Sequence, residues 1–349
     1  MIPIAEVQQC EHIWAMLPST TSLLSPIPAG WQVLHHAILS DGTLALVTTD
    51  VDFASEWELI LASDTPVDPP SRIEQLYKIG RARLLTRAAG GWQDGPVFPL
   101  ETAHPLIDRF SDGRWLVVAS RTRSEPNARV LAPDGALQAR FMLGDAIEHV
   151  VIDSLDRIWV GWFDEGMGGG EWTVPGMEWP PSCNGVACFA PDGAVIEMPS
   201  WPEEAGLIAD CYALTVVGSG VWASPYTDFP IVRFVPGQPA RWWRSELTGP
   251  KAIAVDGMHA LVAGGYGDDA ARLTLVRLQE PGDGQDAGMV ITWRMPLRAA
   301  LPVQNEWAPV WEPPALLAGR GDTLHLIDDG KWHQWRVADA VTAFGDAME

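Results

Sequence analysis

Ionisable and hydrogen-bonding side chains recur at one position of a repeated strand pattern in this sequence. When the repeats are aligned on their turns, a position early in the first strand is mostly polar, and more carboxylates and imidazoles lie just before it. The aligned position holds His35, Leu106, His149, Tyr212, Lys251 and Ala315, and the upstream residues are His104, Glu148, Asp210 and Glu312. Such groups, gathered in one place, can perform acid–base chemistry, bind a polar ligand or attract a metal ion. Each one can equally be a structural polar group that is satisfied by its neighbours.

The longest irregular segment adds two further acidic candidates. Residues 164–185 read DEGMGGGEWTVPGMEWPPSCNG and begin with Asp164 and Glu165. The segment either forms a lid or wall over the site, or is a surface decoration packed by Trp172 and Trp179. Its glycine run is no phosphate-binding loop, because it lacks the following Lys-Ser/Thr and the strand-to-helix context.

The element that must position these residues is a hairpin that occurs six times. Residues 147–163, IEHVVIDSLDRIWVGWF, show its form: an apolar run, a tight polar turn, and a second run rich in Val, Ile and Trp. The copies turn at residues 41–42, 112–113, 153–156, 218–219, 256–257 and 321–322. Uneven intervals between the copies indicate loop insertions in a repeat protein.

Several copies are followed by a second hairpin, which completes a four-stranded antiparallel unit. Residues 128–141 and 186–198 share the turn sequence APDG, and residues 231–243 and 273–293 contain longer versions. Six such units predict an all-β, six-bladed β-propeller that occupies residues 1–349 as a single domain. Its innermost strands would surround a central channel and bring the polar positions together at the mouth of that channel. One or two β-sandwiches are the alternative fold.

The last repeat supplies only three clear strands, so another segment must complete it. The N-terminal segment, residues 1–30, is the candidate for closing the ring, with residues 11–17 as the expected strand. Pro- and Gly-rich segments at residues 66–70, 175–181 and 281–288 fall between strands of the repeat and are predicted to be loops. Helical signals are scarce.

Composition limits the classes of partner. The formal net charge of −22 argues against nucleic acid and anionic membranes, which require basic surfaces. No apolar run reaches the roughly 18 residues of a membrane span, and no signal peptide is apparent, so we expect a cytoplasmic monomer. The cysteines Cys10, Cys183, Cys188 and Cys211 form no Cys-x-x-Cys pair. They are predicted to be free buried thiols, with a disulfide or a metal site as the alternatives.

The repeated SDG and APDG turns resemble those of six-bladed propellers of the NHL and SMP-30/gluconolactonase-like kind. Residues 184–193, NGVACFAPDG, look like the Asn-Gly-containing ligand motif of the lactonases. That resemblance implies one divalent cation, held near the channel mouth by a Glu and Asn or Asp side chains.

The sequence leaves three functions open. The first is a propeller that binds a small molecule or a protein at the channel mouth, on the face of the long loops, without chemistry of its own. The second is a metal-dependent hydrolase or lactonase, for which a divalent cation is the implied cofactor. The third is a protein-interaction module that uses Trp-rich loops. We favour binding, because the sequence contains no Gly-x-Ser-x-Gly, His-Glu-x-x-His or Asp-rich calcium motif.

Overall fold

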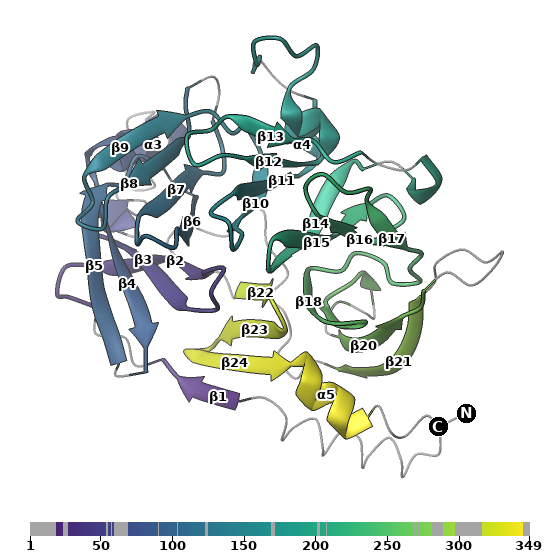
Figure 1. The fold of residues 1–349 in the computed structure, drawn as a ribbon. Coiled ribbons are helices and arrows are strands. Elements are labelled where there is room, and N and C mark those ends of the chain that lie inside the picture. Colours follow the sequence, from purple (N-terminus) through teal and green to yellow (C-terminus); the bar gives the residue numbers. More distant parts are fainter. Residues whose placement is uncertain are drawn as a thin grey trace.

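The chain folds into a six-bladed β-propeller, as the repeats predict (Figure 1). The computed structural model describes residues 19–23, 27–53, 55–56, 58, 69–89, 91–102, 104–122, 125–168, 172–200, 203–206, 208–267, 270, 272–280, 289–296 and 316–344. Each of the six sheets has four antiparallel strands, and we number these blades in chain order.

Within each blade the strands follow one another from the channel outward. Blades 1 and 2 contain β2 (Gln32–Ile38), β3 (Leu44–Thr49), β4 (Arg81–Ala88) and β5 (Gly91–Pro99), then β6 (Pro105–Arg109), β7 (Trp115–Ala119), β8 (Ala128–Leu131) and β9 (Leu137–Phe141). Blades 3 and 4 contain β10 (Ile147–Ile152), β11 (Ile158–Trp162), β12 (Val186–Phe189) and β13 (Val195–Glu197), then β14 (Asp210–Val217), β15 (Gly220–Tyr226), β16 (Ile231–Phe234) and β17 (Arg241–Trp243). Blades 5 and 6 contain β18 (Ala252–Asp256), β19 (His259–Ala263), β20 (Arg272–Leu278) and β21 (Met289–Pro296), then β22 (Leu316–Arg320), β23 (Thr323–Asp328), β24 (Lys331–Arg336) and β1 (Ser19–Ser22).

The repeated Asp-Gly pairs make the tight turns of the hairpins. In blade 1 the Asp41 carboxylate accepts the Thr43 N–H at 2.9 Å, and in blade 2 Asp112 accepts the Arg114 N–H at 3.0 Å. Gly42 has a φ of 81°, a left-handed conformation that strains other residues. These local preferences explain why the turn positions could be read directly from the sequence.

Apolar side chains fill the spaces between neighbouring blades. One cluster joins Val151 and Trp159 of blade 3 to Leu214 and Val221 of blade 4, and similar clusters lie between the other neighbours. Trp159, Trp162 and Trp243 are among the largest fully buried side chains. The tryptophans therefore serve mainly as packing between sheets, since a large ring fills much of the gap between two twisted blades.

An N-terminal strand closes the ring. β1 pairs with β24 from Ser19 opposite Gln334 to Ser22 opposite Lys331, so the last blade draws its outer strand from the start of the chain. The strand lies within the predicted N-terminal segment, whereas the expected closing residues 11–17 are outside the described residues. Arg320 of β22 also donates from Nε to the Ile38 carbonyl of blade 1 at 2.8 Å. Blades 6 and 1 are thus joined at the channel.

The described residues include helices that the sequence did not predict, among them α3 (Pro69–Ile79) and α5 (Val337–Phe344). α3 lies between β3 and β4, and it includes the last two residues of the segment 66–70 that was predicted to be loop. Proline suits the first turn of a helix, where its missing N–H has no partner to lose. Tyr77 of α3 packs against Phe53 with ring centroids 4.9 Å apart. α5 follows β24 and covers the core between blades 5 and 6.

The antiparallel order of the strands gives the ring two different faces. The turns inside the hairpins leave at one face, while the connections between hairpins and between blades leave at the other; the outer pair of blade 6, β24 and β1, has no connecting turn. The innermost strands start at this second face, so the predicted polar positions and the loop of residues 164–185 belong to the same side of the molecule.

Candidate functional site

Three of the innermost strands carry a β-bulge where they enter the ring. The extra residue is Leu34 in β2, Glu148 in β10 and Tyr212 in β14, as the shifts in strand register show. A bulge re-aims the side chain that it contains. Tyr212 therefore shares its position with Glu148 and Leu34, whereas the sequence alignment had placed it with His149 and His35. A slip of one residue is enough to exchange the two directions in which a strand presents its side chains.

Acidic side chains from two blades gather with one lysine at the mouth of the channel. Asp210 opens β14, Glu148 forms the bulge of β10, and Asp164 opens the short helix α4 (Asp164–Met167) at the end of β11. Glu148, Asp164 and Lys251 all contribute to the electrostatic environment of Asp210. Among the described residues, none of these three carboxylates forms an ion pair with a lysine or arginine.

The charge imbalance is felt most strongly at Asp210. Burial raises the pKa of this carboxyl from 3.8 to about 7, and the negative charges of Glu148 and Asp164 add to the rise, while Lys251 opposes it. Asp210 therefore exchanges a proton near neutral pH. His149 lies beside Glu148 and Lys251; burial lowers its pKa, and in the described part of the chain its buried Nε2 atom has no hydrogen-bond partner.

Aromatic rings cover the blade 4 and blade 5 side of the mouth. Tyr212 lies 5.1 Å from Phe229, 6.0 Å from Tyr266 and 6.2 Å from Tyr226, measured between ring centroids. The Tyr212 and Tyr266 hydroxyls are hydrogen-bonded to each other. The Lys251 ammonium lies over the Tyr212 ring, 4.4 Å from its centroid. We call Tyr212, Tyr226, Phe229 and Tyr266 the aromatic cluster.

The sequence reading included Tyr212 but missed the other three members of the aromatic cluster. Tyr226 ends β15, Phe229 lies in the connection that follows, and Tyr266 comes shortly after β19. Phe163 occupies a similar position after β11. Aligning the repeats on the ends of their second strands, as well as on the turns, would have revealed aromatic residues there in three successive blades.

Histidines with lowered pKa values lie on the blade 1 and blade 2 side of the mouth. His35 lies near His36 and His104, and burial together with these two neighbours lowers the pKa of His35 to about 4, so it is neutral at pH 7. Burial, and the charge of Arg121, also lower the pKa of His104. Glu165 forms an ion pair with Arg121. Glu312, the remaining predicted site residue, lies outside the described residues.

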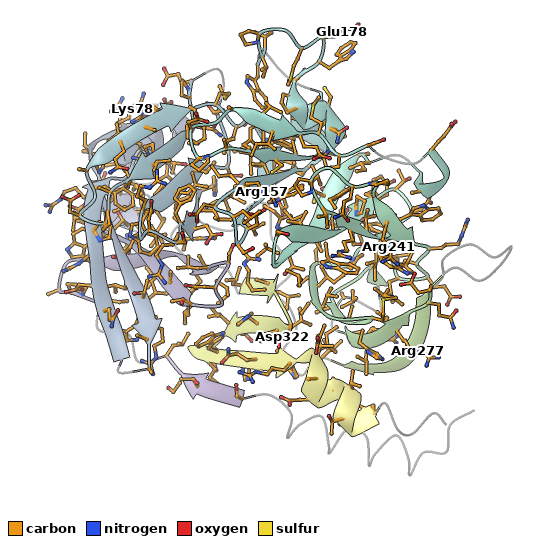
Figure 2. All side chains as sticks on the ribbon, in the orientation of Figure 1. Lys78, Arg157, Glu178, Arg241, Arg277 and Asp322 are labelled. Carbon is orange, nitrogen blue, oxygen red and sulfur yellow. The ribbon has the colours of Figure 1, made fainter. Side chains whose placement is uncertain are left out.

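The long loop divides into a packed part and a projecting part. Trp172 packs against the core residues Trp162 and Phe189 with centroids 6.3 and 6.4 Å away. Trp179 has 67% of its surface exposed, and Figure 2 shows its neighbour Glu178 at the tip of the projecting segment. Trp172 thus fixes the loop to blade 3, as the decoration hypothesis required, whereas the exposed Trp179 does not pack as that hypothesis expected. The lid hypothesis stays a prediction.

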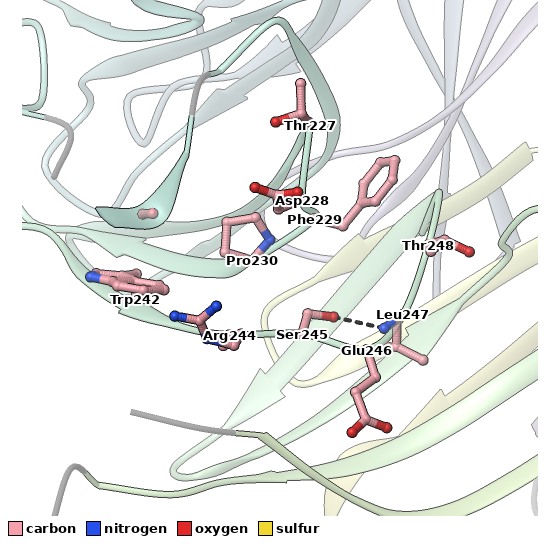
Figure 3. Close-up of a pocket in the computed structure, with 11 residues that line it drawn as sticks. Thr227, Asp228, Phe229, Pro230, Trp242, Arg244, Ser245, Glu246, Leu247 and Thr248 are labelled. Carbon is pink, nitrogen blue, oxygen red and sulfur yellow. Dashed lines mark hydrogen bonds between the residues drawn. The ribbon is translucent and has the colours of Figure 1, made fainter. Parts of the chain in front are cut away.

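A groove lies beside Phe229. This groove, of about 410 Å³, runs between the connection after β15 and the connection that leads from β17 to blade 5 (Figure 3). Trp242 and Arg244 line one wall, and Asp228 and Pro230 lie across from them. Phe229 is both a lining residue of this groove and a member of the aromatic cluster.

The residues present do not fit the metal site that the lactonase resemblance implies. Within the described ranges, no three His, Cys, Asp or Glu side chains converge as ligands of one metal ion. The Asn184 amide nitrogen instead donates to the carbonyls of Val186 and Pro199, which ties the loop to the outer strands of blade 3. Cys183, Cys188 and Cys211 are free thiols, as predicted, but only Cys188 and Cys211 are buried, whereas Cys183 is partly exposed. Cys10 lies outside the described residues.

The raised pKa of Asp210 gives a test of the charge cluster. A carboxyl whose pKa is higher in the folded than in the unfolded protein adds stability that is fully present below the unfolded pKa and is lost as the pH rises through about 7. The neutral amide of an Asp210→Asn variant has no such dependence. The wild type should therefore lose unfolding free energy relative to Asp210→Asn as the pH rises. We expect the difference, Asp210→Asn minus wild type, to grow by about 1–2 kcal/mol from roughly pH 4 to pH 8. This value is reduced because Asp210 is partly exposed to solvent.

Urea unfolding at a series of pH values measures this difference. Glu178→Gln, at the projecting loop tip, is the matched control and should leave the pH dependence unchanged. A difference that stays constant across the range would mean that Asp210 is not in the charge cluster described above.

Comparison with known proteins identifies no family. No protein-family model matches the sequence, and no curated protein does. Similar solved structures include virginiamycin B lyase from Staphylococcus aureus (10% identity, TM-score 0.46, 91% of this chain and 98% of that chain covered). A gluconolactonase from Xanthomonas campestris is 12% identical, with a TM-score of 0.44, and the match covers 91% of this chain and 90% of that chain. The PQQ-bound aldose sugar dehydrogenase from Streptomyces coelicolor is 13% identical, with a TM-score of 0.42, and the match covers 91% of this chain and 97% of that chain. At these scores the likeness carries no argument about activity.

In the part of the chain that the structure describes, no helix is long and apolar enough to cross a membrane.

Proposed function

We propose that this protein binds a small molecule at the channel mouth, on the face where the long connections leave the blades. The observation that carries the proposal is the aromatic cluster. Tyr226 and Tyr266 have 41% and 46% of their surface exposed, although both rings pack on the buried Phe229. Ligand sites combine such apolar surfaces with a few well-placed polar groups. Here the polar groups are Asp210 and Lys251.

Backbone packing holds the cluster in place, which favours a pre-formed site. The Tyr266 ring lies directly over Gly249, where an added Cβ would be 2.7 Å from the ring. The Tyr266 N–H donates to the Thr248 carbonyl at 3.1 Å. Phe229 is buried and has a φ of 51°, an uncommon conformation for a bulky residue that the surrounding packing must maintain. A rigid aromatic surface loses little conformational entropy when a ligand binds.

Binding is better supported than hydrolysis. Among the described residues, no serine, threonine or cysteine side chain is hydrogen-bonded to His35, His104 or His149 through its imidazole, so no nucleophile is paired with a general base. The lactonase ligand motif is not reproduced by the donors around Asn184. The geometry therefore supports recognition at the mouth, with turnover left as the less favoured alternative.

The double variant Tyr226→Ala/Tyr266→Ala tests the proposed function. Saturation-transfer NMR with a mixed set of neutral, anionic and cationic metabolite-sized compounds should identify compounds that bind. The double variant should lower the affinity for these compounds about tenfold or more. Trp179→Ala removes a comparably exposed aromatic side chain from the loop tip and should leave binding within about twofold. Binders that are insensitive to the double variant, or a complete lack of binders, would contradict the proposal.

A further inference from the structure

The geometry points to an organic ammonium ion, a quaternary ammonium or protonated amine of small size, as the ligand of the channel mouth. This inference rests on the proposed function and adds the chemical class of the ligand. Aromatic faces attract cations through the negative charge of their π-systems, and ammonium ligands are commonly bound between such faces and carboxylates. Both kinds of group lie side by side at blades 3, 4 and 5.

The chain itself already places an ammonium group on the aromatic cluster. Lys251 Nζ is 4.4 Å from the centroid of the Tyr212 ring, within the range of an attractive cation–π contact. Lys251 is exposed, so its position over the ring does not result from being enclosed by the core. Tyr226 and Tyr266 offer further aromatic surface to solvent next to this contact.

Negative charge exceeds positive charge at this side of the mouth. Glu148, Asp164 and one lysine, Lys251, act on Asp210, and the two negative charges raise the pKa of Asp210 in addition to the effect of burial. Glu165, the neighbour of Asp164 in α4, is paired with Arg121, so it does not add to this excess. A cation bound beside Asp210 would relieve this repulsion, whereas an anion would increase it.

The arrangement fits a soft organic cation better than a metal ion. Within the described part of the chain, no three acidic or imidazole side chains converge on one point, as the shells of Ca²⁺ or Mg²⁺ require. Aromatic rings supply no ligand oxygen to a hard metal, but they suit a weakly hydrated ammonium group with methyl or methylene substituents. A neutral sugar could pack on the rings and donate hydroxyl hydrogen bonds to the carboxylates, but it would not neutralise their excess negative charge.

Choline and its uncharged isostere 3,3-dimethylbutan-1-ol make the decisive pair of probes. Calorimetric titration of the full-length protein at roughly pH 8 should show choline binding at least about tenfold more tightly than the isostere, the range expected for a partly desolvated cation–π contact. The triple variant Glu148→Gln/Asp164→Asn/Asp210→Asn should remove this preference. Lys251→Met should strengthen choline binding, because it vacates the Tyr212 face and removes a competing positive charge. Glu178→Gln, the control, should change neither the preference for choline over the isostere nor the affinity for choline.

Distinct outcomes separate this inference from the proposed function. If 3,3-dimethylbutan-1-ol binds as tightly as choline and Tyr226→Ala/Tyr266→Ala weakens both, the mouth binds small molecules but the ammonium class is wrong. If Lys251→Met weakens choline binding, or if CaCl2 displaces choline through the same carboxylates, the inference is also overturned. If choline, tetramethylammonium and butylammonium fail to bind at up to about 20 mM, the inference fails whatever the neutral compounds do.

Discussion

Replacing Asp108 with alanine should lower the free energy of unfolding by about 3–5 kcal/mol, the range for a buried hydrogen-bonded charge. Asp108 belongs to β6 and has only 1% of its surface exposed. Its Oδ1 accepts the backbone N–H of Ser40 at 3.0 Å, and its Oδ2 accepts that of Ile152 at 2.7 Å. One carboxyl group thus joins blades 1, 2 and 3 at the channel.

The substitution would leave the Ser40 N–H without its acceptor, and the Ile152 N–H would keep only the Ser40 hydroxyl, 2.9 Å away. The Ser40 hydroxyl, which also bonds to Asp108, and the backbone N–H of Arg109 lose the same partner. Burial raises the pKa of the Asp108 carboxyl, while these hydrogen bonds and the positive charge of Arg320 in blade 6 oppose that rise. Since a buried donor without a partner costs about 1–3 kcal/mol, the loss accumulates over several groups.

Urea unfolding of Asp108→Ala, Asp108→Asn and wild type measures the effect. Asp108→Asn keeps the shape and one carbonyl acceptor, so we expect an intermediate loss. Asp134→Ala is the matched control: Asp134 accepts one N–H, that of Ala136, in an exposed turn, and its removal should cost about 1 kcal/mol or less. A loss below about 1 kcal/mol for Asp108→Ala would show that this network does not hold the blades together.

Gly319→Ala should destabilise the protein by about 3 kcal/mol or more, at the upper end of overpacking effects. Gly319 lies in β22, and a Cβ at this position would overlap the carbonyl group of Ile253 in β18. Both groups belong to backbone that is fixed by strand pairing, so neither can rotate away. Relief would require blades 5 and 6 to move apart, and that movement would open their shared core.

Thermal unfolding and soluble yield report the outcome for Gly319→Ala. Gly168→Ala is the control, because no atom lies within 4 Å of a Cβ added there and its φ of −68° is compatible with alanine. The control should melt within about 2 °C of wild type, the shift expected for a change of a few tenths of a kcal/mol. A Gly319→Ala variant with the wild-type melting temperature would mean that the two innermost strands are farther apart than described.

Local patterns determined the parts of the fold that depend on neighbouring residues. The Asp-Gly turns fix where each hairpin reverses, since Asp41 and Asp112 bond to the backbone two residues on and Gly42 and Gly113 adopt positive φ. The alternation of short and long connections then predicted the propeller and the face on which the site would lie. The same reasoning placed Glu148, Asp210 and Lys251 near one another, because equivalent positions of a ring meet at its axis.

Long-range contacts decided what the sequence could not. The bulge at Tyr212 depends on pairing with β15, so the side chain's position was misjudged by one residue. The closing strand β1 pairs with β24, and Ser19 lies 315 residues before its partner Gln334 in the sequence. The role of Asp108 also depends on the fold, because the donors that it accepts from, Ser40 after β2 and Ile152 of β10, come from two other blades.

The sequence by itself determined the six blades, their turns and the polar character of the mouth, because each follows from preferences within a few residues. Only the tertiary structure decided that Tyr226, Phe229 and Tyr266 join Tyr212, and that Arg121 neutralises Glu165 while Asp210 is left among like charges. Contacts between blades, and the balance of charge in a shared space, depend on the distances between segments far apart in the chain. Those distances are set by the packing of whole sheets and by no local pattern.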